Sequence, residues 1–526
     1  MPGARIAGKR QYHTWTFREL DDDSSRLAAG LQAMGVTPGM RIVLLVRPGF
    51  DFISLTFALF KAGAVTVLID PGMGRKSLIR CLADVEPDGF ISIPLGHAVR
   101  SLLRGRFPRA RFNVTVGRRW FWGGPTIDDL RETRVGAFRP VDVAHDDPAA
   151  IIFTTGSTGP PKGVLYQHGN FTKQVDELQA FYRVEPGEVD LPGFPLFALF
   201  NCAMGVTTVI PDMDPTRPAK ANPRNIVEAI HDWKVTQAFG SPALWNVVGR
   251  YCEVEKIPLP TLRRVLSAGA PVPHHVLHRM KSAIHPDGDV HTPYGATESL
   301  PVASIAASEV LGETAAQSAQ GAGTCVGRRF PGIQWKVIRI SDEPIETIDS
   351  IEELPNGEIG ELIVAGDVVT REYVTRREAN REHKIRDGAA IWHRIGDVGY
   401  LDAQDRFWFC GRKAHRVITP QGVLYTIPCE AIFNQLKEVY RSALVGVGDP
   451  GAQRPVIVVE TWPEHRPATK KQREALLQAL REQALLYEHT RDIRDFLIHP
   501  SLPVDIRHNA KIFREKLAVW AAKQIS

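Results

Sequence analysis

The sequence predicts an α/β protein with a large N-terminal domain and a small, mobile C-terminal α+β cap. Its 526 residues exceed what one hydrophobic core usually supports, so two domains are expected. Residues 42–69 read as an apolar run, a helix-length amphipathic segment and a second apolar run, the β-α-β pattern of helices packed on a largely parallel sheet. The pattern changes after Arg412, which places the two domains at 1–411 and 412–526.

The same alternation recurs along the chain. The next segments expected as strands are AAIIF (149–153), TTVI (207–210), TQAFG (236–240) and RRVLSAGAP (263–271). From about residue 325, shorter segments separated by Gly, Asp and Asn are typical of β-hairpins: WKVIRI (335–340), GELIVAG (360–366) and RFWFCGR (406–412). Beyond the boundary, we expect a strand at 442–448 and a helix at 470–486.

Composition narrows the class of protein. The 64 basic and 59 acidic residues give a net charge of +5, too mild over this length to indicate nucleic acid as a partner. The six cysteines form no C-x-x-C pair, which favours a reducing compartment over a structural zinc site. The first residues lack the apolar core of a signal peptide, and Lys61 and Pro195 interrupt the longest apolar stretches, so we expect a cytoplasmic protein.

The stretch TTGSTGPPKG (154–163) combines flexible backbone with hydroxyl donors and one lysine. Glycine allows successive N–H groups to converge on one point, and Ser, Thr and Lys add donors and charge, so the stretch indicates a polyphosphate-binding loop. It is not a Walker A loop, because Pro161 and Gly163 flank Lys162. A surface turn without a ligand is the alternative.

Three further segments make this loop specific: YGATES (294–299), IGDVGYLD (395–402) and FCGRK (409–413). With the loop, they resemble the adenylate-forming superfamily of acyl-CoA synthetases, peptide-synthetase adenylation domains and luciferases, over almost the whole chain. The resemblance implies ATP and Mg²⁺ and the activation of a carboxylate as its adenylate. Carboxylate attack on the α-phosphorus brings anion to anion, so such a site must neutralise charge and hold the atoms in line.

The resemblance also implies roles for individual residues. Phosphate contacts fall to Thr154, Thr155, Gly156, Ser157, Thr158, Gly159 and Thr297, with Lys162 assisting loop closure. Glu298 would carry Mg²⁺, and Asp397 and Arg412 would bind the ribose hydroxyls. Adenine would lie between Tyr294, Gly295, Ala296 and the turn Gly269, Ala270, Pro271. Taken singly, a loop glutamate or an aspartate after glycine is more often a solvated or turn-forming residue.

The catalytic residues implied are Lys511, Glu298 and Thr297. Lys511 lies in DIRHNAKIFREKLA, where Asn509 and Ala510 replace the Ser-Gly usual in the family, and the alternative is an ordinary exposed lysine. The domain hinge of the family usually carries Asp or Lys where this chain has Ala414, although a longer segment here could move the hinge to His415. An altered hinge puts the thioester-forming conformation, and therefore coenzyme A use, in question.

Four segments, EVDLPGFPLFALF (188–200), TPYGATESLPVASI (292–305), GRKAHRV (411–417) and RHNAKIF (507–513), resemble a narrower group, the β-lactone synthetases of bacterial long-chain olefin biosynthesis. The resemblance implies adenylation of a long-chain 2-alkyl-3-hydroxy fatty acid, whose own hydroxyl then closes a β-lactone and expels AMP without a thiol. It also implies a complex with other enzymes of that pathway. The alternatives are a long-chain fatty acyl-CoA ligase and a non-catalytic adenylate-binding assembly subunit. Ala414 would mark an enzyme that does not need the thiolation movement.

Two other segments have a functional and a structural interpretation. Residues 191–210 could line an acyl tunnel, in which case Ala203→Trp should shorten the preferred chain, or they are buried core. Between Arg100 and Trp122 lie seven arginines and no acid, ending in RRWFWGG. This pattern indicates peripheral membrane contact or RNA, against an ordinary solvated face; with the mild net charge, we expect no nucleic-acid partner.

Overall fold

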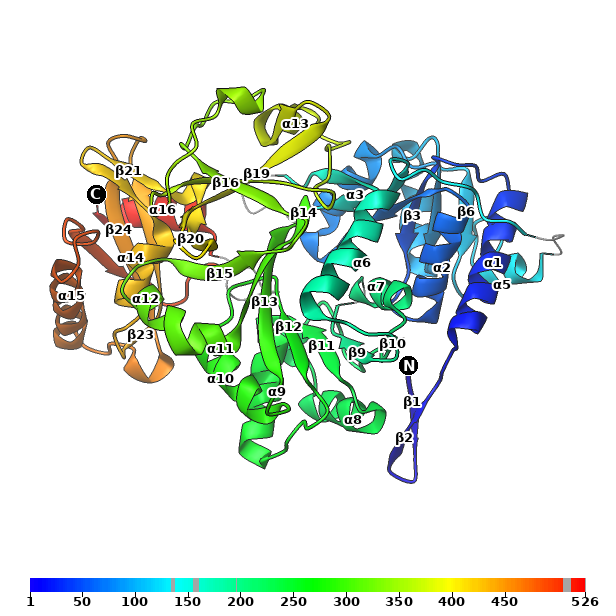
Figure 1. Cartoon of the computed structure of the whole chain (residues 1–526), viewed down its shortest axis with the longest axis horizontal. Coiled ribbons are helices and arrows are strands. Elements are labelled where there is room, and N and C mark those ends of the chain that lie inside the picture. Colours follow the sequence, from blue (N-terminus) through cyan, green and yellow to red (C-terminus); the bar gives the residue numbers. More distant parts are fainter. Residues whose placement is uncertain (134–137, 155–159, 195, 505–511, 526) are drawn as a thin grey trace.

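The computed structural model describes residues 1–133, 138–154, 160–194, 196–504 and 512–525. A six-stranded sheet with its helices lies at one end of the molecule, a long sheet occupies the middle, and the C-terminal elements lie at the other end (Figure 1). A two-stranded hairpin, β1 (Pro2–Ile6) and β2 (Lys9–Tyr12), precedes them. In the part of the chain that is described, no helix is both long and apolar enough to cross a membrane.

The six-stranded sheet has the order β6-β5-β3-β4-β7-β8. Its strands are β3 (Arg41–Leu45), β4 (Val65–Leu68), β5 (Gly89–Ser92), β6 (Phe112–Thr115), β7 (Pro148–Phe153) and β8 (Gly163–Gln167). Its helices are α1 (Phe17–Ala33), α2 (Phe50–Lys61), α3 (Arg75–Asp84), α4 (Pro94–Leu102), α5 (Ile127–Glu132) and α6 (His168–Tyr182). The β-α-β unit predicted at 42–69 is confirmed, because β3 and β4 are parallel neighbours joined by α2. Only the last pair, β7 and β8, is antiparallel.

The long sheet has the order β10-β9-β11-β12-β13-β14-β15-β20-β19-β17-β16, with β18 paired to β19. Its first half is parallel: β9 (Val189–Pro192), β10 (Thr207–Thr208), β11 (Gln237–Gly240), β12 (Arg264–Ser267) and β13 (Asp289–Ala296). Its second half is antiparallel: β14 (Ser299–Ala306), β15 (Thr324–Arg329), β16 (Gln334–Ile338), β17 (Gly360–Ala365), β18 (Lys384–Asp387), β19 (Ala390–Leu401) and β20 (Arg406–Arg412). The predicted β segments after residue 325 are therefore confirmed, whereas TTVI forms a strand of only two residues.

The helices between these strands are α7 (Phe197–Met204), α8 (Pro223–Trp233), α9 (Pro242–Glu255), α10 (His274–Ala283), α11 (Ala307–Glu309), α12 (Ala315–Ala319) and α13 (Glu378–His383). Helix α9 shows why such segments form here. Ser241 accepts a hydrogen bond from the backbone N–H of Leu244, and Pro242 opens the first turn, where its missing N–H is not needed. Leu244, Trp245 and Val248 then bury one face of the helix in the core.

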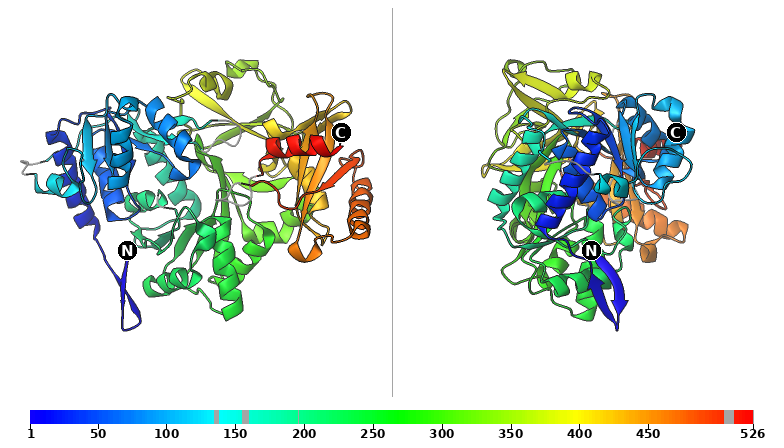
Figure 2. Two further views of the ribbon diagram at one scale, coloured as in Figure 1. Left: turned by 180° about the vertical axis from the view of Figure 1, so that it is seen from behind. Right: turned by 90° about the vertical axis from the view of Figure 1, so that its right-hand side faces the viewer.

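The C-terminal part has its own sheet and core. Its strands are β21 (Val417–Thr419), β22 (Gly422–Leu424), β23 (Val439–Val447), β24 (Arg454–Thr461) and β25 (Asp495–Ile498). Its helices are α14 (Thr426–Phe433), α15 (Lys470–Leu485) and α16 (Arg514–Ile525). The predicted strand at 442–448 and helix at 470–486 are confirmed. Phe433, Leu444, Ile457 and Leu480 are fully buried together, and Figure 2 shows α16 lying across the C-terminal strands.

Candidate active site

Three predicted residues from separate strands are joined by hydrogen bonds to the carboxylate of one of them, Asp397. Asp397 of β19 lies opposite Arg412 of β20, and Arg412 Nη1 donates to Asp397 Oδ1 at 2.6 Å. The hydroxyl of Tyr294, from β13, donates to Asp397 Oδ2 at 2.5 Å. Asp397 is 5% exposed, and its charge raises the pKa of Arg412. Burial, reinforced by Asp397, likewise raises the pKa of Tyr294, so the phenol stays protonated and donates.

Arg412 still has a donor to offer. Its Nε atom is buried and has no hydrogen-bond partner within the described residues. Buried polar groups are rarely left unpaired, so an orphaned guanidinium N–H beside a carboxylate is what a ligand hydroxyl or phosphate would satisfy.

The predicted adenine-binding segments lie at the carboxyl ends of two neighbouring strands inside the long sheet. Gly269, Ala270 and Pro271 begin two residues after the end of β12, and Tyr294, Gly295 and Ala296 end β13, its parallel neighbour. Gly269 has a φ of +94°, a conformation that L side chains rarely adopt. The carboxyl ends of neighbouring parallel strands are a common place for ligands in α/β sheets.

Glu298 lies in the turn between β13 and β14 and is held by a segment that the sequence did not single out. Tyr373 OH donates to Glu298 Oε1 at 2.5 Å, and the backbone N–H of Thr370 donates to the Glu298 carbonyl at 2.9 Å. Tyr373 is 1% exposed. Glu298 Oε2 has no hydrogen-bond or ion-pair partner among the described residues, which leaves one carboxylate oxygen for a cation.

The described ends of the predicted phosphate loop, Thr154 and Lys162, lie where β7 ends and β8 begins. They are tied together, since Thr154 N donates to the Lys162 carbonyl at 3.0 Å and Lys162 N donates to Thr154 Oγ1 at 3.2 Å. Thr155, Gly156, Ser157, Thr158 and Gly159 lie outside the described residues, as does Lys511. Next to Glu298, the carbonyl of Thr297 accepts a hydrogen bond from Tyr166 OH of β8 at 2.5 Å, which connects the hairpin to the YGATES turn.

A cationic cluster surrounds Tyr373. Lys162 Nζ lies 5.0 Å and Lys384 Nζ 5.6 Å from the centre of its ring. Burial and the nearby Lys162 lower the pKa of His383 to about 3, so this neutral ring accepts a hydrogen bond from Lys162 Nζ at 2.8 Å. Burial lowers the pKa of Lys384 to about 7. Two amines beside Glu298 suit a site that receives several phosphate charges.

Sequence reasoning missed Tyr373, His383 and Lys384. Tyr373 lies in the connection after β17, His383 ends α13 and Lys384 begins β18, and their role depends on contacts with residues far away in the chain. Isolated bridges join Val164 to Tyr373 and Ser299 to Val369, so this connection lies between the hairpin and the YGATES turn. In the sequence, the available signal was a tyrosine followed by a charged stretch at 376–384. That pattern alone does not indicate a site.

A cavity of about 70 Å³ adjoins the predicted adenine-binding segments. Ala268 and Pro293 line it, and these residues immediately precede Gly269 and Tyr294 in the chain. Its other walls include Leu178 and Tyr182 of α6, Phe200 and Met204 of α7, and Phe239 of β11. Residues 191–210 therefore contribute to an apolar cavity, but Ala203 does not line it. The expectation for Ala203 is wrong, because that residue faces solvent on α7.

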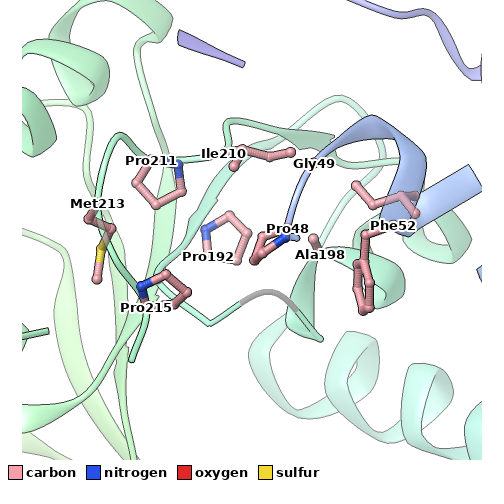
Figure 3. A pocket seen from close by; sticks show the side chains of 11 residues that line it. Pro48, Gly49, Phe52, Pro192, Ala198, Ile210, Pro211, Met213 and Pro215 are labelled. Carbon is pink, nitrogen blue, oxygen red and sulfur yellow. The ribbon is translucent and has the colours of Figure 1, made fainter. Parts of the chain in front are cut away.

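One buried carboxylic acid lies in this cavity wall. Asn201 Nδ2 donates to Asp190 Oδ2 at 2.7 Å, and burial raises the pKa of Asp190 to about 7. A smaller cavity of about 30 Å³ lies where α7 meets the loop before α2, with Ala198, Pro192, Pro48 and Phe52 around it (Figure 3). Helix α7 thus has a cavity beside each of two faces.

The candidate hinge is held on both sides. Lys413 Nζ is 3.1 Å from Glu361 Oε2 of β17, in the long sheet. His415 Nε2 donates to Glu515 Oε1 of α16 at 3.2 Å, on the C-terminal side. Ala414 lies between them in a single 3₁₀ turn (Lys413–His415) and contributes no polar side chain.

Residues 2–374 match the family described as AMP-binding enzyme, and the chain belongs to this family. Members use ATP, and the chain is an ATP-dependent, AMP-forming ligase by class. The olefin beta-lactone synthetase of Xanthomonas campestris pv. campestris is 48% identical over 531 residues, covering 99% of this chain and 94% of the relative. That of Stenotrophomonas maltophilia is 48% identical over 535 residues, covering 100% and 95%.

Solved structures show the same fold. The anthranilate CoA ligase AuaEII in complex with anthranoyl-AMP superimposes with a TM-score of 0.77 at 18% identity, over 98% of this chain and 93% of that one. The amide bond synthetase McbA from Marinactinospora thermotolerans also gives 0.77, at 21% identity, over 96% and 95%. The resemblance to adenylate-forming enzymes, and within them to β-lactone synthetases, is confirmed.

Proposed function

We propose that this protein converts a long-chain 2-alkyl-3-hydroxy fatty acid and ATP into a β-lactone, AMP and pyrophosphate. The observation that carries the proposal is the 48% identity to olefin beta-lactone synthetases over nearly the full length of both chains. We further propose that the large domain covers residues 1–411 and the cap 412–526, and that the enzyme works in the cytoplasm in a complex with other olefin-forming enzymes.

The nucleotide would bind at the carboxyl ends of β12 and β13 in the long sheet. Asp397 and Arg412 would hold the ribose hydroxyls, and the free N–H at Arg412 Nε supports this assignment. Adenine would lie between the turn Gly269–Ala270–Pro271 and the segment Tyr294–Gly295–Ala296, at the carboxyl ends of two parallel strands. Thr297, beside Glu298, would contact phosphate.

The phosphates and Mg²⁺ would lie between the hairpin loop and Glu298. The loop residues Thr154, Thr155, Gly156, Ser157, Thr158 and Gly159 would grip the phosphates, with Lys162 closing the loop. Mg²⁺ is usually held by one or two carboxylates together with substrate phosphates, and a Glu298 with one oxygen unpartnered fits that donor set. When bound, the ion neutralises phosphate charge, and Lys511 would add a positive charge at the reacting phosphate.

The reaction balances without a thiol. A carboxylate oxygen of the acid attacks the α-phosphorus, and pyrophosphate leaves. The oxygen of the substrate's 3-hydroxyl then attacks the activated carbonyl carbon and loses its proton, and AMP departs with the carboxylate oxygen that had bonded to phosphorus. Both reacting groups belong to one molecule, so an apolar cavity that fixes the chain also fixes the attack geometry.

The second candidate is a long-chain fatty acyl-CoA ligase, which shares the first half-reaction. The hinge favours the lactone reaction, because Ala414 lies between two anchored neighbours and lacks the polar side chain usual at that position. A non-catalytic adenylate-binding subunit is the third candidate, and the grouping of Glu298, Asp397 and Arg412 around unpartnered polar atoms speaks against it.

The test uses pure protein, ATP, Mg²⁺ and a synthetic 2-alkyl-3-hydroxy fatty acid, with and without coenzyme A, and identifies the products by mass spectrometry and NMR. We expect a β-lactone with AMP, independent of coenzyme A. Glu298→Gln keeps an acceptor for Tyr373 but removes the charge, and should lower turnover by about tenfold to 1,000-fold. Glu352→Gln, at a surface ion pair with Arg339, is the matched control and should not. An acyl-CoA formed only with the thiol would make the protein a conventional ligase.

A further inference from the structure

Helix α4 exposes an apolar stripe to solvent. Leu95, Val99 and Leu102 are 64%, 40% and 80% exposed, and their spacing of four and three residues puts them on one face. The opposite face is fixed to the protein, since His97 is fully buried and hydrogen-bonds through Nε2 to the Val114 carbonyl at 2.8 Å. At 1.5 Å per residue the helix is about 13 Å long, and the apolar stripe runs along most of that length.

Two exposed aromatic residues are connected to α4 through the buried Trp122. Trp120 and Phe121 are 53% and 71% exposed. Their rings lie 5.4 and 5.0 Å from that of Trp122, which is buried and lies 5.6 Å from the His97 ring. Trp122 therefore anchors both exposed rings beside α4. We call Leu95, Val99, Leu102, Trp120 and Phe121 together the α4 surface; a group of exposed large apolar side chains on and beside one helix commonly marks an interaction site.

Exposed arginines lie close along the chain to both parts of the α4 surface. Arg104 and Arg106 form the 3₁₀ turn directly after α4, and Arg118 lies just before Trp120. All three are exposed, and within the described ranges no carboxylate is close enough to form an ion pair with any of them. The sequence between Asp88 and Asp128 contains no acidic residue; Arg109 of this stretch pairs with Asp88, whereas Arg104, Arg106 and Arg118 are left without an ion pair among the described residues.

The position of the α4 surface leaves it accessible. Helix α4 joins β5 to β6, and β6 is the edge strand of the six-stranded sheet. The described residues assigned to nucleotide binding lie instead next to β7 and β8, at the opposite side of that sheet (Thr154 and Lys162), and in the long sheet. A large flat partner could therefore cover α4 without contacting the candidate active site.

We propose that the α4 surface docks onto a lipid bilayer that contains anionic lipids. Leucine, valine and aromatic side chains between arginines are the composition of an interfacial membrane-binding element, whose apolar residues enter the headgroup–acyl boundary while the cations contact lipid phosphates. RNA would use the arginines and aromatic rings but would gain nothing from aliphatic residues exposed in a row. The proposal does not depend on the reaction, although docking would bring the enzyme to a poorly soluble acyl substrate.

The experiment is co-sedimentation of the full-length protein with extruded vesicles, without ATP or acid. Vesicles of phosphatidylcholine alone are compared with vesicles that also contain phosphatidylglycerol. We expect binding to the anionic vesicles that is at least about tenfold tighter and that weakens as salt is raised. Blue-shifted tryptophan fluorescence on binding, lost in Trp120→Phe, would locate the contact.

Two variants test the two components separately. Leu102→Glu with Phe121→Glu removes the apolar contact, and Arg104→Gln with Arg106→Gln and Arg118→Gln removes charge; each should weaken binding by about tenfold or more. The matched control is Leu485→Glu with Leu486→Glu, at residues 60% and 72% exposed at the end of α15, which should bind like the unaltered protein. Circular dichroism melting checks that every variant folds.

Three outcomes would overturn the proposal: no binding to anionic vesicles, equal loss of binding in the Leu485/Leu486 control, or unchanged binding in both α4-surface variants. Binding of RNA that competes fully with vesicles and depends on the arginines alone would assign the surface to nucleic acid instead. None of these outcomes bears on lactone formation, which is measured separately with soluble protein.

Discussion

Single residues in the candidate site have partners that leave one polar atom available. Asp397 occupies Arg412 Nη1 but not Nε, and Tyr373 occupies one oxygen of Glu298 but not the other. Lys162 donates to a neutral His383 rather than to a carboxylate. Burial lowers the pKa of Lys162 and the nearby Glu298 partly offsets this, although no ion pair is formed between the two side chains. The side chains are positioned by protein contacts while their binding capacity remains for a ligand.

The buried acid Asp190 gives a prediction for pH dependence. Its folded-state pKa of about 7 lies above the ordinary 3.8, so the folded protein binds the extra proton between these values. Stability should therefore fall as pH rises from about 4 to about 7, and the full cost of ionising this group is present above that range. Asp190→Asn removes the cost and should stabilise the protein at pH 8 by up to about 4 kcal/mol, with little gain at pH 4.

Urea unfolding of Asp190→Asn and of the unaltered protein at the two pH values measures this difference. Asp176→Asn, on the exposed face of α6, is the matched control and should show no pH-dependent gain. A gain from Asp190→Asn that is the same at both pH values would mean that Asp190 is ionised, or neutral, in folded and unfolded protein alike.

At the scale of elements, α7 has two different faces. Met204 lines the larger cavity, whereas the neighbouring Ala203 faces solvent. Met204→Trp should fill part of the cavity and lower kcat/KM for the longest acyl chains by about tenfold or more, with shorter chains affected less. Ala203→Trp on the same helix is the control. Competition between acids of different length, read by mass spectrometry, gives the preference; an unchanged preference in Met204→Trp would remove the cavity from the acyl site.

Elements could be predicted from the sequence where the pattern is local. Residues 42–69 carry their β-α-β periodicity within themselves, and the helix at 470–486 has its own capping residue, Thr469. The orientation of Ala203 could not be predicted, because an almost wholly apolar helix does not reveal which face is buried. TTVI forms only two residues of strand because it lies at the end of the sheet, with one neighbouring strand, β9.

The same limit applies to the site. Residues in short motifs, such as Glu298, Asp397 and Arg412, could be found because their motifs are continuous. Tyr373 and Lys384 could not, because their contacts with Glu298 and Thr370 come from the folded arrangement of distant segments. Lys511 and the loop at 155–159 stay predictions, since they lie outside the described residues.

At the scale of the whole molecule, the segment around Ala414 is one place where the residues before and after it meet, and α14 also packs against β20 and α12. Lys413 contacts Glu361 of the long sheet, and His415 contacts Glu515 of α16. Rotating the residues after Ala414 against those before it would therefore strain or break at least one of these two contacts. An enzyme whose substrate supplies its own nucleophile does not need that rotation to admit a thiol. The hinge, together with the 48% identity to olefin beta-lactone synthetases, supports the proposed intramolecular ring closure.

The most direct test of this account follows oxygen atoms. The 3-hydroxy acid is labelled with ¹⁸O in its carboxyl group and incubated with ATP, Mg²⁺ and protein in unlabelled water, and AMP and lactone are analysed by mass spectrometry. Activation of the carboxylate predicts one ¹⁸O in AMP and one in the lactone carbonyl. Unlabelled AMP with both labels retained in the lactone would show that the hydroxyl was activated instead, and would contradict the account.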